Sequence, residues 1–242
     1  MHKYNIGCSG YYYQNWKNKF YPVKLQPKQW LEYYSSVFNT VELNGTFYRT
    51  PKLEDLKRYA AVTKDDFTFS AKMSKYISHI IKMKDSKESI DQFQELIFNG
   101  LEKKLDCFLF QLPPTFHYTE ENLNRIIENV PHQPHNVIEL RHISWWNEDV
   151  ETAFKKANLT FCNVDYPGLK SHIISTSNLF YFRFHGNPEL FKSAYTVEEL
   201  RHFSNSFPNE NKNQFVYFNN TYYEAGYTNA IQLIEIIKEK NA

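Results

Sequence analysis

The stretch Val137-Ile138-Glu139-Leu140-Arg141-His142-Ile143-Ser144-Trp145-Trp146 begins as an apolar run and ends in charged and aromatic side chains. Val137, Ile138 and Leu140 supply the β-favouring bulk of a buried strand. Because alternate side chains of an extended chain share a face, Glu139 and Arg141 are expected to point the same way. Paired charges at the end of a buried strand indicate either a structural ion pair or a site, and both interpretations stay open here.

An apolar run that ends in polar residues recurs along the whole chain. Besides the stretch quoted above, strands are expected at residues 4–7, 40–44, 67–72, 107–112, 159–164, 179–184 and 215–218. Helices are expected from Pro27 onward, over residues 53–62, 87–100, 148–157, 197–207 and 225–240, and after a cap at Thr119. Strands therefore alternate with helices along the chain.

This alternation predicts a single α/β domain over residues 1–242, a TIM-like (β/α)8 barrel. Units of roughly 30 residues, each a strand and a helix, form parallel sheets, and eight such units close into a barrel. The connection between the sixth and seventh strands is the weak point, because residues 171–176 offer an extra strand and no helix is evident there. A doubly wound open sheet is the structural alternative.

The composition is that of an ordinary globular chain with many aromatic rings. Of 242 residues, 42% are hydrophobic and 23% charged, and the net charge of +1 argues against a globally basic nucleic-acid binder. Aromatic residues make up 17%, a share that suits packing and ligand clefts. The three cysteines have no metal-site or redox spacing, no apolar run reaches the length of a membrane span, and no signal peptide is evident. We expect a cytoplasmic protein with no membrane association.

Six segments, in order, resemble one known family. They are IGCSG at 6–10, TVELNGTFYR at 40–49, FQLPP at 110–114, ELRH at 139–142, FRFHG at 182–186 and YFNNT at 217–221. Together they look like the YecE-like family, also called domain of unknown function 72, over nearly the whole chain. The resemblance implies a TIM-like barrel and no established activity. Tyr11, Gly45 and Leu140 stand where that family usually has Trp, Ser and Phe.

Parallel strands bring their C-terminal ends to one face, where the sites of such barrels lie. Seven of the eight expected strands end in a charged or amide side chain, whereas the opposite ends begin with aromatic or aliphatic residues. We therefore predict a ligand site at this mouth in preference to a purely structural polar plug. The candidate substrate-binding residues are Arg141, Arg183, Lys72, Asn44, Gln111, Asp165, Asn219, Asn220, Tyr11 and Trp145.

The cations among these candidates indicate a small anionic ligand. Arg141, Arg183 and Lys72 supply up to three positive charges, which suits a phosphate or a carboxylate. In the structural alternative, Arg141 pairs with Glu139, and Arg183 pairs with Asp165 or Glu42, so that no charge is free.

The candidate catalytic residues are His185, Glu139 and Glu42. A buried imidazole beside a carboxylate can be tuned to exchange protons near neutral pH, although a histidine beside Gly186 is equally an ordinary turn residue. A divalent metal held by these residues and Asp165 is disfavoured, because each comes from a different strand and nearby cations compete with it. No Gly-rich phosphate loop is present, so a nucleotide cofactor is not expected. We therefore predict neither a metal nor a cofactor.

Two functions stay open. The first is an enzyme or binding protein for a small anion, as an enzyme a metal-independent hydrolase, isomerase or lyase. The second is a nucleic-acid-binding module, less favoured, in which arginines at the mouth hold phosphates and loop aromatics stack on bases. Those aromatics are Tyr11, Tyr12, Tyr13, Trp16, Trp145 and Trp146. The sequence does not indicate an oligomeric state.

Overall fold

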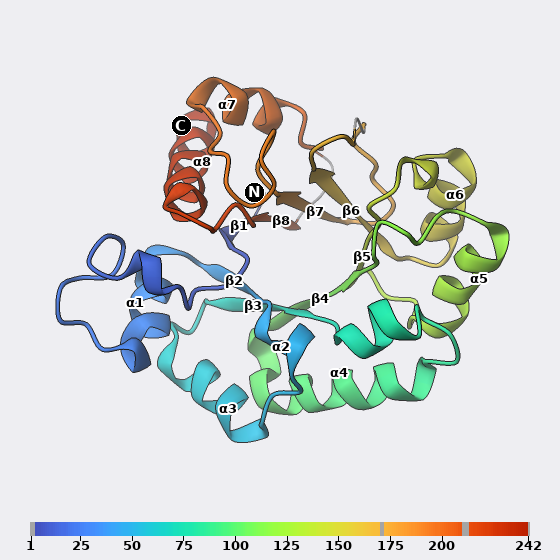
Figure 1. Cartoon of the computed structure of the whole chain (residues 1–242), viewed down its shortest axis with the longest axis horizontal. Helices are drawn as coiled ribbons and strands as arrows, with labels where there is room; N and C mark the ends of the chain where they lie inside the picture. Colours follow the sequence, from blue (N-terminus) through green and yellow to red (C-terminus); the bar gives the residue numbers. More distant parts are fainter. Residues whose placement is uncertain (1–2, 170–171, 210–212, 242) are drawn as a thin grey trace.

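The computed structural model describes residues 3–169, 172–209 and 213–241, and its eight parallel strands form one nearly closed barrel. Figure 1 shows the strands at the centre and the helices around them. The strands are β1 (Lys3–Cys8), β2 (Thr40–Leu43), β3 (Thr68–Lys72), β4 (Leu105–Gln111), β5 (Asn136–Glu139), β6 (Thr160–Asp165), β7 (Leu179–Phe184) and β8 (Asn213–Phe218). Each strand pairs in parallel with its neighbour in the order β1-β8-β7-β6-β5-β4-β3-β2.

The helices lie on the outside of the strand ring (Figure 1), except for the short helix α2, which lies at the mouth of the barrel. They are α1 (Trp30–Val37), α2 (Gly45–Tyr48), α3 (Leu53–Val62), α4 (Lys87–Leu101), α5 (Glu120–Asn129), α6 (Glu148–Lys156), α7 (Val197–Asn205) and α8 (Ala225–Asn241). As expected, Thr119 caps α5, because its side chain accepts a hydrogen bond from the Asn122 backbone N–H at 3.1 Å. No helix of the described residues has both the length and the apolar composition needed to cross a membrane.

The structure confirms the TIM-like barrel, and the open-sheet alternative is wrong. Short elements that were not expected include helix α2 directly after β2 and a π-helical turn at Tyr76–Ile80 after β3. The extra strand that residues 171–176 offered as a possibility is not formed by the described residues 172–176. Side chains hold this segment beside β6, because the Ile174 backbone N–H donates to Asn163 Oδ1 at 2.8 Å and the Phe161 N–H donates to Thr176 Oγ1 at 2.9 Å.

The apolar strand residues divide into two cores, one inside the barrel and one between the strands and the helices. Alternate residues of a strand face opposite sides, so both faces of each strand are buried and the runs read as continuously apolar. In β7, Phe180, Phe182 and Phe184 pack in the outer core, whereas Leu179 and Tyr181 belong to the inner one. The inner core comprises Cys107, Leu109, Val137, Cys162, Val164, Leu179, Tyr181, Phe215 and Tyr217.

Between β1 and β2 the ring is closed mainly by side chains. The strands share a single parallel bridge, Ser9 with Glu42. Below it, the Asn39 amide replaces ladder hydrogen bonds, because its Nδ2 donates to Tyr4 O at 2.8 Å and its Oδ1 accepts from the Ile6 N–H at 3.1 Å. The hydroxyl of Tyr34 accepts from the Cys8 N–H at 2.7 Å and donates to Thr40 O at 3.2 Å.

Gly7 makes this close approach of β1 and β2 possible. A Cβ atom at this position would lie 2.1 Å from the carbonyl oxygen of Thr40 and 2.8 Å from the Tyr34 hydroxyl. No side chain fits at that distance, so the strands can meet here only over a glycine.

We expect Tyr34→Phe to lower the free energy of unfolding by about 1–3 kcal/mol, because it leaves the buried Cys8 N–H without an acceptor. The matched control is Tyr33→Phe in the same helix, whose hydroxyl bonds to none of the described residues and whose loss should change stability by less than about 0.5 kcal/mol. Urea unfolding of both variants measures the difference. Equal stabilities would show that the Tyr34 hydroxyl does not contribute to closure of the barrel.

Candidate functional site

At the C-terminal end of the barrel interior, the alternating inward positions change from apolar to charged. Glu42 of β2, Glu139 of β5 and Arg183 of β7 are all 0% exposed. Arg183 lies between the two carboxylates: its Nη2 donates to Glu42 Oε1 at 2.6 Å, and its Nη1 donates to Glu139 Oε2. We call Glu42, Glu139, Arg183 and His185 the buried cluster.

Hydroxyl groups add further hydrogen bonds to this cluster. Tyr181 donates to Glu42 Oε2 at 2.8 Å and lies 2.8 Å from the hydroxyl of Ser70. Arg183 Nη2 also donates to Ser9 Oγ at 3.2 Å. Buried charges are stable only when they are paired and hydrogen-bonded in this way.

His185 lies beside Glu139 as a neutral imidazole. Its Nδ1 accepts from Asn219 Nδ2 at 3.0 Å, which places the ring proton on Nε2, and that atom lies 3.2 Å from Glu139 Oε1. Burial and the nearby arginines lower the pKa of His185 to about 3, although Glu139 opposes them. Although burial acts in the opposite direction, Arg141, Arg183 and His185 hold the pKa of Glu139 well below its usual range, so the carboxylate stays ionised.

Above the buried cluster, a cavity of about 1320 Å³ opens at the mouth of the barrel. None of the four cluster residues lines it. Its floor carries Asn44, Lys72, Gln111, Arg141 and Asn219, which follow or end β2, β3, β4, β5 and β8. Its walls are largely aromatic and comprise Tyr11, Tyr12, Tyr13, Phe47, Tyr48, Tyr59, Phe191, Tyr222 and Tyr223.

Arg141 connects the buried cluster to the cavity. Its Nε donates to Glu139 Oε1 at 2.5 Å, and its guanidinium carbon lies 5.2 Å from the centre of the Tyr166 ring. The side chain is 10% exposed and lines the cavity. Because the carboxylate holds the Nε edge, the outer nitrogens of the guanidinium are the ones available to a ligand.

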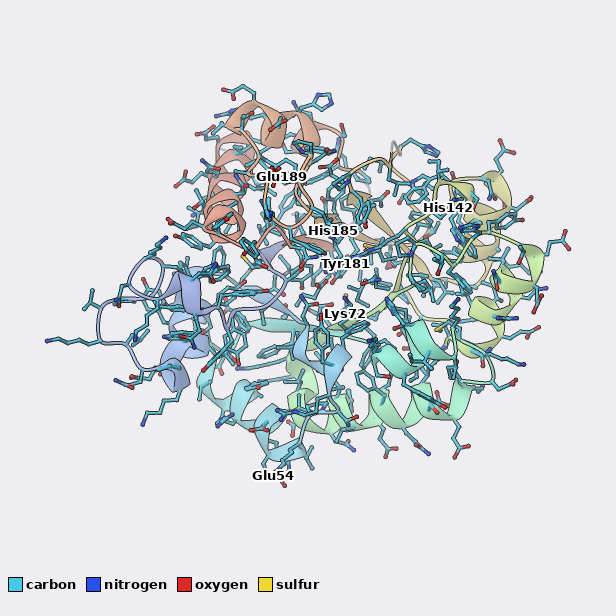
Figure 2. The ribbon with its side chains drawn as sticks, in the orientation of Figure 1. Glu54, Lys72, His142, Tyr181, His185 and Glu189 are labelled. Carbon is cyan, nitrogen blue, oxygen red and sulfur yellow. The ribbon has the colours of Figure 1, made fainter. Side chains whose placement is uncertain are left out.

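Lys72 is the other cation on the floor, and Figure 2 shows it near the centre of the ring together with Tyr181 and His185. Its Nζ lies 4.4 Å from the centre of the Phe47 ring. Burial, together with the charges of Arg183 and Arg141, lowers the pKa of Lys72 to about 7. His79 lies against the same Phe47 ring at 4.9 Å, and burial with the charge of Lys72 lowers its pKa to about 4.

Comparison with known proteins assigns the family. Residues 5–242 match the family model described as "Protein of unknown function DUF72". The chain belongs to the DUF72 family. A DUF72 protein of Thermotoga maritima MSB8 has the same fold, with a TM-score of 0.89 at 30% identity over 98% of this chain and 100% of that one. A DUF72 protein of Enterococcus faecalis V583, at 23% identity over 98% of each chain and a TM-score of 0.79, shares the fold.

Two relatives of this DUF72 chain carry the designation UPF0759. YunF of Bacillus subtilis strain 168 is 26% identical over 256 residues, covering 91% of this chain and 90% of YunF. YecE of Escherichia coli K12 is 32% identical over 113 residues, which span 46% of this chain and 41% of YecE. The match to YecE therefore covers less than half of that protein. The family resemblance expected from the six sequence segments is confirmed.

The DUF72 barrel brings together most of the residues that we expected at its mouth. The cavity is lined by Arg141, Lys72, Asn44, Gln111, Asn219 and Tyr11. Arg183, Glu42, Glu139 and His185 lie directly beneath, and Arg183 pairs with both carboxylates and not with Asp165. Among the described residues, no group of three or more metal-ligating side chains is placed to hold a metal ion.

Three expected residues lie elsewhere. Asp165 and Asn220 follow Val164 and Asn219 by one position, and therefore face the outside of the barrel. Asp165 Oδ2 accepts from the Tyr195 hydroxyl at 2.6 Å, and Asn220 Nδ2 donates to Ser193 O at 2.9 Å. Trp145 is fully buried. Its indole Nε1 donates to Phe116 O at 2.7 Å, and its ring stacks on the Phe116 ring.

Several residues of the site were not expected from the sequence. Ser9, Ser70 and Tyr181 share the inward-facing positions of their strands with the predicted residues, so strict alternation along each strand is the signal that would have found them. His79 follows β3 in the π-helical turn, and Tyr59 comes from α3. No periodicity in the sequence places these two side chains at the mouth.

Proposed function

We propose that this DUF72 protein binds a small anionic molecule in the cavity at the C-terminal mouth of its barrel. The distribution of charge around the cavity carries this proposal. The basic residues that line it are Arg49, Lys72 and Arg141. The one carboxylate among the described residues of the lining belongs to Asp55, whose Oδ1 lies 2.9 Å from Nη2 of Arg58. Basic side chains therefore outnumber acidic ones around the cavity, which suits a phosphate or a carboxylate.

The walls indicate that the ligand also has an apolar or ring-shaped part. Aromatic side chains surround the cations, and ligand pockets commonly combine such walls with a few polar groups that set orientation. The volume of about 1320 Å³ exceeds the usual range of roughly 300–1,000 Å³, so the cavity has room for a ligand larger than a three-carbon acid.

The buried cluster supports this function from below as a set of positioning residues. His185 is 0% exposed and stays neutral near pH 7, because its pKa is lowered to about 3. We therefore propose that Glu139, Glu42 and His185 act by fixing Arg141 and Arg183, in place of the proton transfer that we expected of them. The groups that a ligand can touch are Lys72, Arg141, Asn44, Gln111, Asn219 and Tyr11.

The test is a thermal-shift panel of carboxylates and phosphate esters, followed by calorimetry, since any ligand of the folded state raises its stability. We expect Arg141→Met to weaken binding of the best anion by roughly 10- to 100-fold, because it removes charge-assisted hydrogen bonds. Arg141→Lys should weaken binding less. Arg125→Met, on the remote helix α5, is the control. If no anion stabilises the protein, or if Arg141→Met binds as tightly as Arg125→Met, the proposal is wrong.

A second candidate function is binding of single-stranded nucleic acid, and exposed rings at the rim favour it. Tyr48 is 79% exposed, Tyr223 58% and Tyr222 57%, and each lines the cavity near Arg49 or Asn219. Such rings stack on bases. Trp16 and Trp145, which we also expected to stack, are fully buried. Oligonucleotide binding that weakens steeply with salt would support this alternative, and no binding at low salt would exclude it.

We propose the cytoplasm as the compartment of this function. The three cysteines, Cys8, Cys107 and Cys162, are free and buried. Unpaired thiols are typical of reducing compartments. Localisation of a tagged full-length protein by cell fractionation tests this expectation.

A further inference from the structure

Lys72 differs from Arg141 and Arg183 in its pairing. The two carboxylates of the buried cluster are already occupied: Glu139 pairs with Arg141 and Arg183, and Glu42 pairs with Arg183 and accepts from Tyr181. Because the two carboxylates are balanced by the two guanidiniums, no unpaired negative charge is left for a third cation. Among the described residues, Lys72 Nζ forms no ion pair or hydrogen bond, and it lies 4.4 Å from the centre of the Phe47 ring.

We infer that Lys72 is a nucleophile that forms an imine with a carbonyl compound bearing a carboxylate or a phosphate. This inference rests on the proposed anion-binding function, because Arg141 would hold the anionic group while the carbonyl carbon lies at Lys72 Nζ. Both side chains line the same cavity from neighbouring parts of the barrel mouth. The cavity walls provide the apolar surroundings that activate a lysine.

The charges around Lys72 make its amine available near neutral pH. The groups that face it are Arg183 and Arg141, which disfavour its proton, Glu139 and Glu42, which favour it, and His79. His79 itself remains uncharged near pH 7, because its pKa is about 4. With a pKa of about 7, a large fraction of Lys72 is the neutral amine at pH 7, whereas an exposed lysine with a pKa of about 10.4 is almost wholly protonated.

The step balances with no further reactant. The lone pair of Nζ attacks the carbonyl carbon, a C–N bond forms, and the C=O π electrons move to oxygen, which takes one proton from the amine. The carbinolamine oxygen then takes a second proton from solvent and leaves as water, and the nitrogen lone pair completes the C=N⁺ bond. Such an iminium withdraws electrons from the adjacent carbon, so it serves lyase or isomerase chemistry and not hydrolysis.

Reductive trapping tests the inference directly. The full chain is incubated with sodium cyanoborohydride and either pyruvate or dihydroxyacetone phosphate, and adducts are located by mass spectrometry of intact protein and peptides. We expect one adduct per chain, on Lys72, with a yield that rises through about pH 7. Lys72→Arg, which keeps the charge, and Lys72→Met should lose it, and the exposed Lys75→Arg should retain it.

Lactate and glycerol 3-phosphate, which lack the carbonyl group, separate this inference from the proposed function. Binding of these anions, measured by calorimetry, with no adduct on Lys72 in the presence of pyruvate or dihydroxyacetone phosphate would overturn the imine and leave anion binding intact. Adducts spread equally over Lys72, Lys75 and other exposed lysines would also overturn it. Absence of adducts, together with no binding of any anion in the thermal-shift panel, would overturn the proposed function and this inference together.

Discussion

Replacing Arg183 with methionine is expected to lower the free energy of unfolding by about 3–5 kcal/mol, the typical cost of leaving buried charges without their partner. Arg183 is 0% exposed and donates to both Glu42 and Glu139. Glu139 would keep Arg141, but Glu42 would keep only the Tyr181 hydroxyl. Urea or thermal unfolding at pH 7 measures the effect.

The matched control is Arg201→Met, because Arg201 forms an ion pair of similar geometry at 2.7 Å with Glu239, on side chains that are 50% and 61% exposed. Exposed pairs contribute about 0–1 kcal/mol, so this variant should be nearly as stable as the wild type. Adding Glu42→Gln to Arg183→Met should recover part of the loss, since it removes the uncompensated charge. Equal effects of Arg183→Met and Arg201→Met would show that the cluster does not depend on its arginine.

Lys72→Met is expected to stabilise the protein at neutral pH. The pKa of Lys72 falls from 10.5 to about 7 in the folded chain. Between these values the unfolded chain binds a proton that the folded chain has lost, so the wild type gains stability as the pH rises, by about 1.4 kcal/mol for each pH unit. Below pH 7 the charged amine is fully penalised by burial, and its removal should gain on the order of 4–5 kcal/mol.

The sign of this pH dependence is the diagnostic feature. The advantage of Lys72→Met should be largest at pH 7 and below, and should shrink toward zero as the pH approaches 10.5. Unfolding free energies at several pH values test it, with the exposed Lys75→Met as a control that should change little throughout. A Lys72→Met variant that is less stable than the wild type at pH 7 would mean that the ammonium is stabilised where it lies.

The alternation of strands and helices predicted the barrel, with a doubly wound open sheet left as the alternative. The strands were evident because both of their faces are buried and their apolar runs are long. The charged strand ends likewise predicted Arg183, Glu139 and Glu42. The sequence failed at single positions: Asp165 and Asn220 were assigned to the mouth, although Val164 of β6 and Asn219, directly after β8, occupy the inward positions. The alternation of side chains between the two faces of a strand decides these cases.

Other parts of the site depend on how loops pack, and no pattern in the sequence reports that. Gly45–Tyr48 folds as a helix and brings Phe47 over Lys72, and the turn at Tyr76–Ile80 brings His79 to the same ring. Tertiary packing also decides whether a charged side chain at a strand end faces the cavity or is buried beneath it. The same residue types at the ends of β5 and β7 give Arg141 in the cavity and His185 beneath it.

The closure between β1 and β2 has a consequence for how this protein tolerates mutation. Hydrogen bonds between strand backbones tolerate almost any side chain. Here, however, β1 and β2 are joined through the amide of Asn39 and the hydroxyl of Tyr34, and Gly7 leaves the space that their close approach needs. A substitution at any of these positions is therefore expected to weaken the contact between β1 and β2. In hydrogen-exchange experiments, the amides of Ile6 and Cys8 should therefore exchange sooner than those of β7, and the ring should part first along this line.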